Sequence, residues 1–258
     1  MKVVILCGGK GTRLSEETVA RPKPMVEIGG KPILWHIMKH YSAHGFNEFV
    51  LALGYKADYI KNWFYHLRLT ANDFTISLDP GVDPVIHGGA ELDPWTVTCV
   101  DTGEETQKGG RIKRLAEHLA GERFMVTYGD GVADVDLAAL LAFHESHGGL
   151  ATLTGVRPPS RFGAIELDGD RVTDFDEKPQ LSTGFINGGY FVFEPGVLDY
   201  LTTDEDCDLE FGALQQLAAD GQLFVHRHEG FWQCMDNVRE RDYLESLWAG
   251  GTAPWKAW

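Results

Sequence analysis

Short apolar runs alternate with amphipathic stretches along the first two thirds of the chain. Residues 2–7 form an aliphatic run that stops at a glycine-rich loop, which is typical of a buried strand. Residues 32–44 place apolar side chains at helical intervals, with Pro32 near the first turn and Gly45 after the end. The same patterns predict strands at 48–53, 96–100, 123–128 and 150–155, and helices at 57–67, 111–119 and 136–147. This alternation favours a doubly wound α/β fold, with a mostly parallel sheet covered on both faces.

The pattern changes between residues 158 and 196. Short alternating stretches at 164–167, 171–175 and 189–193 are separated by glycine, proline and aspartate, and they predict antiparallel additions. Helices are expected again at about 208–219 and 238–248, before a tail with Trp255 and Trp258. We predict a single domain over residues 1–258, with an α/β core at about 1–155. A β-rich part at about 156–236 and a C-terminal helix and tail at 237–258 complete it.

Composition and charge narrow the class of protein. The 258 residues are 43% hydrophobic and 24% charged, which is ordinary globular usage. No run approaches the roughly 20 apolar residues of a membrane span, and the opening run is too short for a signal peptide, so we expect a cytoplasmic protein without a membrane partner. A net charge of -15 argues against nucleic-acid binding, because that binding depends on cations that neutralise phosphates. The four scattered cysteines predict reduced thiols rather than disulfides or a zinc site.

The loop after the first strand, Gly8-Gly9-Lys10-Gly11-Thr12-Arg13, is a candidate phosphate site. Its backbone amides can converge on an anion, its missing side chains allow close approach, and Arg13 adds positive charge. A plain glycine turn is the alternative. A dinucleotide loop would need a small residue at Leu14, and a Walker loop would need Gly-Lys-Ser/Thr at residues 13–15, so we favour phosphate binding of another kind.

Three further charged residues are candidates for the same site. Lys23 lies between two prolines, which restrict the backbone and can hold its ammonium group toward a phosphate. Asp130 stands between two glycines after a strand, and Asp236 follows an aromatic run, so both carboxylates can reach one Mg²⁺. The alternatives are a solvated charge for Lys23, an Asx turn for Asp130, and a helix cap for Asp236 or Asn237.

Glu177, Lys178 and Asn187 lie in the predicted β-rich part. A carboxylate and an amide can hydrogen-bond sugar hydroxyls while Lys178 holds a phosphate, although each motif alone is an ordinary surface turn. Combined with the glycine loop, Lys23 and the two aspartates, they supply what phosphoryl transfer between two anions requires.

These motifs resemble those of the sugar-phosphate nucleotidyltransferase superfamily, through residues 8–13 and 22–25. Within it the chain is most similar to the glucose-1-phosphate cytidylyltransferase family, through residues 14–18, 29–38, 127–134 and 253–256. Cys7, and Cys234 where proline is expected, depart from the family pattern, and residues 204–208 match it poorly. The resemblance implies a nucleotide-diphospho-sugar transferase fold, which is a Rossmann-like core with a small β-rich sugar-binding insert. It implies that the core at about 1–155 binds the nucleotide and that the part at about 156–236 binds the sugar phosphate.

The resemblance also implies substrates and residue roles. CTP and glucose 1-phosphate are the implied substrates, and Mg²⁺ is held by Asp130 and Asp236. The implied catalytic residues are Arg13, Lys23, Lys178 and Asp130. The implied nucleotide-binding residues are Leu6, Gly8, Gly9, Lys10, Gly11, Thr12, Arg13, Lys23, Thr102, Arg111 and Gly129. Glu177 and Asn187 are implied to bind the sugar hydroxyls, and Lys178 its phosphate.

The implied reaction is in-line attack of a sugar phosphate oxygen on the α-phosphorus of CTP, with release of pyrophosphate. A homo-oligomer, expected to be a hexamer, and a place in making deoxysugars for lipopolysaccharide O antigen are implied in the same way. The tail tryptophans can equally contact another subunit or pack on their own domain. The same reaction with dTTP or UTP is the nearest alternative. A silent nucleotide-sugar-binding subunit would not need both aspartates, and a dehydrogenase would need a dinucleotide loop.

Overall fold

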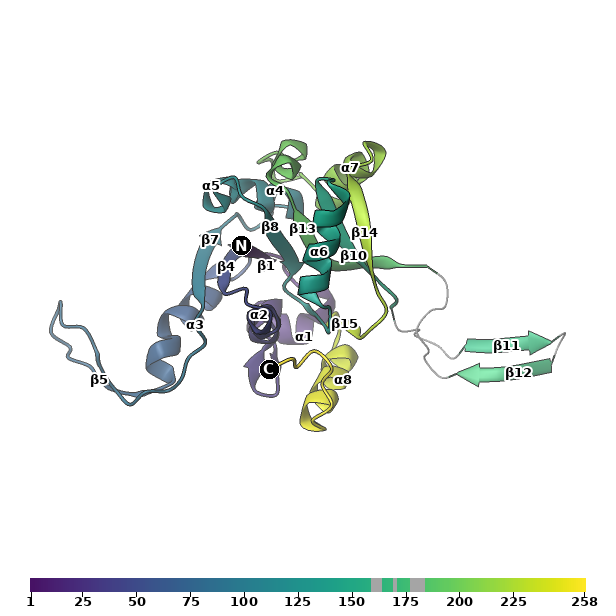
Figure 1. Cartoon of the computed structure of the whole chain (residues 1–258). Helices are drawn as coiled ribbons and strands as arrows, with labels where there is room; N and C mark the ends of the chain where they lie inside the picture. Colours follow the sequence, from purple (N-terminus) through teal and green to yellow (C-terminus); the bar gives the residue numbers. More distant parts are fainter. Residues whose placement is uncertain (159–163, 169–170, 177–183) are drawn as a thin grey trace.

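The computed structural model describes residues 1–158, 164–168, 171–176 and 184–258 (Figure 1). Its centre is a seven-stranded sheet in the order β14–β10–β13–β8–β1–β4–β7. The strands are β1 (Lys2–Leu6), β4 (Glu48–Leu53), β7 (Thr96–Asp101), β8 (Phe124–Tyr128), β10 (Ala151–Val156), β13 (Ile186–Phe193) and β14 (Leu223–His228). Neighbouring strands are parallel except at β13, which runs antiparallel to both β8 and β10. The predicted mostly parallel α/β sheet is confirmed.

Helices cover both faces of this sheet (Figure 1). One face packs against α2 (Ile33–Ala43), α3 (Ala57–Thr70), α6 (Leu137–His147) and α8 (Val238–Ala249). The other packs against α4 (Lys108–Arg114), α5 (Ala116–Leu119), the π-helix η4 (Leu209–Leu214) and α7 (Gln215–Ala219). Val3 and Ile5 of β1 enter the first core, and Val4 and Leu6 enter the second. Burial on both faces is the physical reason that this strand reads as a continuous apolar run.

Short helical turns and four small ribbons complete the described part of the chain. The turns are η1 (Thr12–Leu14), α1 (Ser15–Thr18), η2 (Lys23–Met25) and η3 (Pro195–Tyr200). The antiparallel ribbons are β2 (Glu27–Ile28) with β3 (Lys31–Pro32), β5 (Asp73–Thr75) with β6 (Val85–His87), β9 (Gly131–Ala133) with β15 (Trp232–Cys234), and β11 (Ala164–Asp168) with β12 (Arg171–Asp176). The β11–β12 ribbon confirms the antiparallel pair predicted there.

Several elements differ from the sequence-based expectation. The helix expected at 111–119 is two helices, α4 and α5, and the helix expected at 208–219 begins as the π-helix η4. The stretch expected at 189–193 is antiparallel, but as β13 it lies inside the main sheet rather than being added outside it. Strand β14 was not predicted. It pairs with β10 at the edge of the sheet, and its alternating exposure leaves no continuous apolar run to detect.

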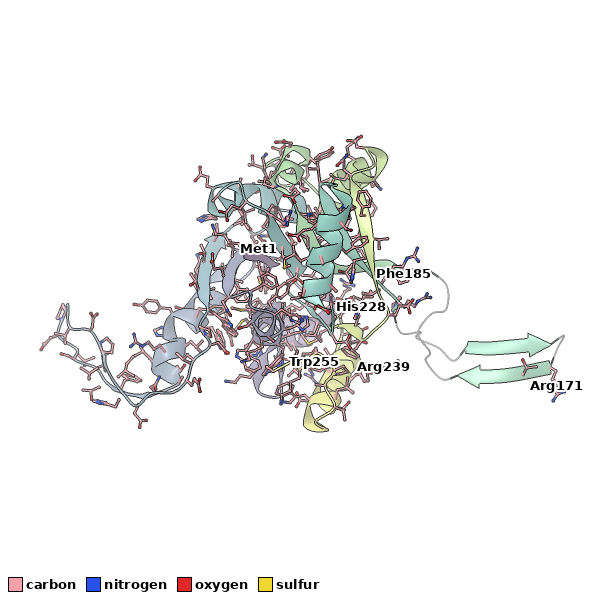
Figure 2. All side chains as sticks on the ribbon, viewed as in Figure 1. Met1, Arg171, Phe185, His228, Arg239 and Trp255 are labelled. Carbon is pink, nitrogen blue, oxygen red and sulfur yellow. The ribbon has the colours of Figure 1, made fainter. Side chains whose placement is uncertain are left out.

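The tryptophan tail packs on its own domain (Figure 2). Trp255 is fully buried, and its ring stacks on Phe231 at a centroid distance of 5.6 Å. Its indole Nε1 donates to Nδ1 of His36, whose Nε2 then donates to the carbonyl of Ile28. This packing is the second of the two arrangements that the sequence left open for Trp255.

All four cysteines are free thiols, as predicted. In the part of the chain that the structure describes, none of the helices combines the length and the apolar character needed to cross a lipid bilayer.

Candidate active site

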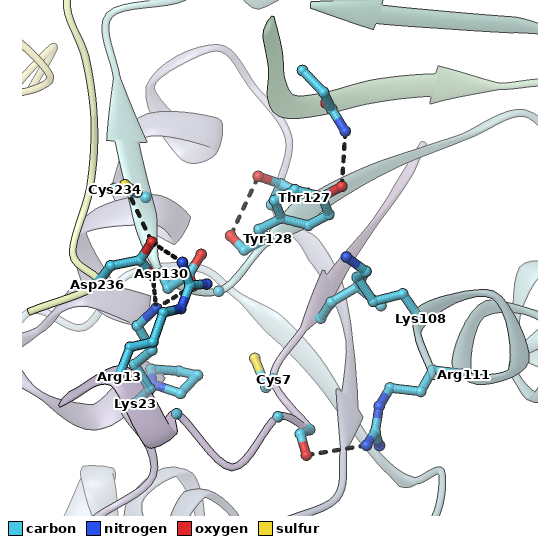
Figure 3. Close-up of a pocket in the computed structure, with 18 of the residues that line it drawn as sticks. Cys7, Arg13, Lys23, Lys108, Arg111, Thr127, Tyr128, Asp130, Cys234 and Asp236 are labelled. Atoms are coloured by element: carbon cyan, nitrogen blue, oxygen red, sulfur yellow. Dashed lines mark hydrogen bonds and ion pairs between the residues drawn. The ribbon is translucent and has the colours of Figure 1, made fainter. Parts of the chain in front are cut away.

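A pocket of about 480 Å³ opens at the carboxyl ends of β1 and β8, the edge where parallel sheets present ligand sites (Figure 3). Most of the predicted site residues line it: Leu6, Gly8, Gly9, Gly11, Thr12, Arg13, Lys23, Arg111, Gly129, Asp130, Asn187 and Asp236. Lys10 and Thr102 are described but lie outside the lining, whereas Glu177 and Lys178 lie outside the described residues. The chain therefore brings segments from residue 6 to residue 236 to one place.

Arg111 supports the glycine loop through hydrogen bonds to backbone carbonyl groups. Its buried guanidinium donates to the carbonyls of Gly8 at 3.0 Å, Leu53 at 2.9 Å and Gly103 at 2.7 Å, and to the Thr102 hydroxyl at 2.8 Å. A Cβ atom on Gly8 would lie 2.1 Å from Nη1 of Arg111, so only glycine allows this approach. Arg111 thus shapes the loop through its backbone, and Thr102 lies buried behind it.

The two cations of the glycine loop point to different partners. Lys10 is directed to the exposed Glu105, with 2.5 Å between Nζ and Oε1. Arg13 extends across the pocket and contacts Oδ2 of Asp236 at 2.5 Å, although its own side chain is 73% exposed. Arg13 is therefore placed to meet an anion in the pocket, and Lys10 is turned toward the rim.

Lys23 joins the two predicted metal ligands (Figure 3). Its Nζ lies 2.5 Å from Oδ2 of Asp130 and 2.6 Å from Oδ1 of Asp236, and only 7% of its side chain is exposed. Burial by itself would lower the pKa of Lys23, but attraction to Asp130 and Asp236 outweighs it and the pKa is raised. Lys23 is therefore a fixed ammonium group rather than a solvated surface charge.

The β9–β15 ribbon explains why two aspartates so far apart in sequence meet. Gly131 pairs with Cys234, and the amide of Met235 donates to the carbonyl of Asp130 at 2.8 Å. The next helix is capped by Asn237, whose side chain accepts from the amide of Glu240. Since Asn237 takes the capping role, the carboxylate of Asp236 is left to face the pocket.

Asp130 and Asp236 fit a hard divalent cation. One oxygen of each already contacts the same cationic atom, Nζ of Lys23, so the two oxygens are no farther apart than two hydrogen-bond lengths. Carboxylate oxygens are the ligands that Mg²⁺ prefers. Cys234 and Glu240 offer further donor atoms beside Asp236. Burial raises the pKa of the Cys234 thiol to about 12. Soft sulfur is in any case a poor ligand for a hard ion such as Mg²⁺.

Sequence reasoning missed a second polar group in the pocket. Lys108, at the start of α4, contacts Oε1 of Glu210 at 2.5 Å and lies over the ring of Tyr128. The hydroxyl of Tyr128 also donates to Glu210, and Asn187 Nδ2 donates to Tyr128 at 2.9 Å. Tyr128 directly precedes the Gly129-Asp130 motif, and this position in the sequence could have identified it as a pocket residue. Nothing in the local pattern around Glu210 indicated a site.

The chain matches nucleotidyl transferases over its whole length. The family model described as nucleotidyl transferase matches residues 2–236. A glucose-1-phosphate cytidylyltransferase of Salmonella typhi is 50% identical over 259 residues, covering 100% of both chains. A Bacillus subtilis protein named as a probable glucose-1-phosphate cytidylyltransferase is 42% identical, again over 100% of both.

Solved structures share the fold. HddC from Yersinia pseudotuberculosis superposes with a TM-score of 0.66 at 23% identity, covering 96% of this chain and 99% of that one. A UDP-glucose pyrophosphorylase complexed with UDP-glucose gives a TM-score of 0.68 at 14% identity, covering 97% and 98%. These two similarities establish a common architecture, which agrees with the fold expected from the sequence.

Proposed function

Because the chain belongs to the glucose-1-phosphate cytidylyltransferase family of nucleotidyl transferases, we propose that it forms CDP-glucose and pyrophosphate from CTP and glucose 1-phosphate. The single observation that carries the site assignment is the convergence of Arg13, Lys23, Asp130 and Asp236 in one pocket. A triphosphate and a sugar phosphate repel each other, and a site that joins them must supply matching cations.

The reaction needs no protein nucleophile. An anionic phosphate oxygen of glucose 1-phosphate attacks the α-phosphorus of CTP and forms the new P–O bond. The bond from that phosphorus to the oxygen bridging to the β-phosphate breaks, and pyrophosphate leaves with the electron pair. The protein's contribution is to align the two substrates and to stabilise charge on the transferring and leaving groups.

The proposal gives each cation a place in this alignment. The glycine loop donates backbone amides to the triphosphate, and Arg13 and Lys23 neutralise its phosphates. Asp130 and Asp236 would hold Mg²⁺, which would supply Lewis-acid stabilisation to phosphate oxygens. Lys178 holds the phosphate of the sugar, with Glu177 and Asn187 on the sugar hydroxyls.

The ion pairs of the pocket support this assignment. Lys23 and Arg13 carry two positive charges and are paired with the two negative charges of Asp130 and Asp236. Asp130 and Asp236 would pair with a bound metal ion, and Arg13 and Lys23 would pair with a triphosphate. The four side chains can then exchange partners without leaving a buried charge unpaired.

The same proposal includes an oligomer, with a hexamer as the expected form, and a cytoplasmic location. The β5–β6 ribbon and its loop extend away from the body (Figure 1) and expose apolar side chains, among them Ile76, Leu78 and Val85. Exposed apolar surface of this kind is typical of subunit contacts. Sedimentation of the wild type and of an Ile76→Asp, Leu78→Asp variant tests the oligomer and this contact surface. A monomeric wild type would refute the oligomer, and an unchanged oligomer in the variant would refute the contact surface.

Pyrophosphate release tests the function. We expect release with CTP, glucose 1-phosphate and Mg²⁺ together, and little when CTP is replaced by UTP, dTTP or GTP. Omission of the sugar phosphate or addition of a chelator should abolish it. Equal rates with another nucleotide would refute the base assignment, and release without sugar phosphate would refute the reaction. The place of the product in O antigen synthesis stays a proposal that follows from CDP-glucose formation.

A further inference from the structure

Three polar side chains of the pocket lining, Lys108, Tyr128 and Asn187, form one network with a fourth, Glu210. Lys108 and Tyr128 both contact Oε1 of Glu210, and Asn187 donates to the Tyr128 hydroxyl at 2.9 Å. Lys108 and Tyr128 (Figure 3) line the pocket together with Asn187, whereas Glu210 comes from the π-helix η4 and is not part of the lining. Glu210 can therefore act on the pocket only through its neighbours.

The carboxylate at the end of this network determines the direction of its hydrogen bonds. An ionised carboxylate only accepts, so Tyr128 must donate its one proton to Glu210. The Tyr128 oxygen can then only accept, and Asn187 must turn its NH₂ group toward it. At the other end of the amide, Oδ1 of Asn187 accepts from the backbone N–H of Gly189 at 2.9 Å. Both contacts require the same orientation of the amide, which is therefore fixed.

The charges around the Tyr128 hydroxyl are balanced. Lys108 lies 5.2 Å from the centre of the Tyr128 ring and contacts Glu210, so it balances the charge of the carboxylate. The network thus carries no net charge, and its hydrogen bonds are donated in one direction, from Asn187 to Tyr128 and from Tyr128 to Glu210.

Fold stability does not explain the carboxylate at position 210. Its second oxygen, Oε2, is buried and has no hydrogen-bond partner in the described part of the chain. A buried acceptor without a partner destabilises the folded state, and more so when it is charged. Glu210 also lies in a π-helix, a geometry that occurs frequently at functional sites. The unpaired oxygen is a cost to the fold that an apolar residue at this position would avoid, which points to a role in the pocket.

We propose that Glu210 is a positioning residue for the sugar substrate. Through Tyr128 it holds the amide of Asn187 so that one N–H and one carbonyl lone pair remain for the hydroxyls of the sugar. The inference rests on the proposed function, because the sugar phosphate is the acceptor in that reaction. It adds a determinant of sugar affinity that lies outside the pocket lining.

Glu210→Gln tests the proposal because a glutamine can turn its NH₂ group toward Tyr128. The phenol then has no acceptor at residue 210, and its proton opposes the N–H that Asn187 donates to it. The amide of Asn187 is therefore displaced, or it turns over and loses the bond from the backbone N–H of Gly189. We expect KM for glucose 1-phosphate to rise about tenfold and KM for CTP to change less than twofold, as for one misdirected hydrogen-bond pair. Tyr128→Phe should give the same pattern, and the double variant should be no worse than either single one, since both act through one path.

Glu145→Gln is the matched control. Glu145 is also ion-paired, to Arg123 at 2.6 Å, and it lies outside the pocket lining. Its substitution should leave both KM values unchanged. Melting temperatures of all variants should stay within a few degrees of the wild type.

Three results would overturn the proposal: additive effects of the two substitutions, equal rises in both KM values, or wild-type kinetics in Glu210→Gln. Calorimetric titration of glucose 1-phosphate and, separately, of CTP with Mg²⁺ into wild type and variants measures affinity independently of turnover. If the wild type is active and Glu210→Gln has the same KM values and affinities, only this inference is refuted. A wild type that neither binds glucose 1-phosphate nor turns over defeats the proposed function, and this inference with it.

Discussion

Replacing Asp236 with asparagine separates the chemical role of this carboxylate from its role in the fold. The side chain contacts Nζ of Lys23 at 2.6 Å and the guanidinium of Arg13 at 2.5 Å. Asparagine keeps the shape and one acceptor oxygen but removes the charge. If Asp236 binds the metal that the reaction needs, turnover should fall by roughly two to three powers of ten, as for other lost electrostatic groups.

The effect on stability should be small by comparison. Lys23 keeps Asp130 at 2.5 Å, so the buried ammonium group is not left without a charged partner. The pair with Arg13 is exposed on the arginine side and contributes little. One weakened hydrogen bond corresponds to about 1 kcal/mol, or roughly 3 °C in melting temperature for a chain of this size.

The assay is pyrophosphate release at saturating CTP and glucose 1-phosphate, with Mg²⁺ titrated over a wide range and melting followed in parallel. Asp93→Asn is the control, because Asp93 forms a similar pair with Lys39 at 2.6 Å but lies outside the pocket lining. The control should keep wild-type turnover. Turnover of Asp236→Asn within tenfold of wild type, with an unchanged Mg²⁺ dependence, would remove Asp236 from the metal site.

Three further outcomes are expected. Lys178→Ala should raise KM for glucose 1-phosphate more than KM for CTP in steady-state kinetics, and the reverse pattern would contradict its assignment. Trp255→Ala should destabilise by about 3–5 kcal/mol, lowering the melting temperature by roughly 10 °C, because the ring is fully buried. Burial lowers the pKa of His36 from 6.5 to about 4, so unfolding free energy from urea titrations should fall between about pH 6.5 and pH 4, where the unfolded chain binds the proton first. His36→Gln should reduce that dependence.

The local sequence determined the fold class, because each strand and helix of the core carries its own pattern. Residues 2–7 are apolar on both faces because β1 lies between two cores, and 32–44 repeat at helical intervals because α2 buries one side. The glycine loop was also visible in the sequence, since Gly8 must leave room for another group. That this group is the guanidinium of Arg111 could not be read from the chain.

Contacts between distant segments were decided only by tertiary structure. Asp130 and Asp236 meet because β9 pairs with β15, and a three-residue ribbon carries too little pattern to predict its partner. Whether Asp236 or Asn237 capped the last helix was equally balanced in the sequence, until the cap formed at Asn237 and left Asp236 to the pocket. Glu210 gave no sequence signal because its importance lies in the two side chains that it contacts, and those come from α4 and β8. Sequence periodicity reports which face of an element is buried, whereas a site depends on which buried faces come together.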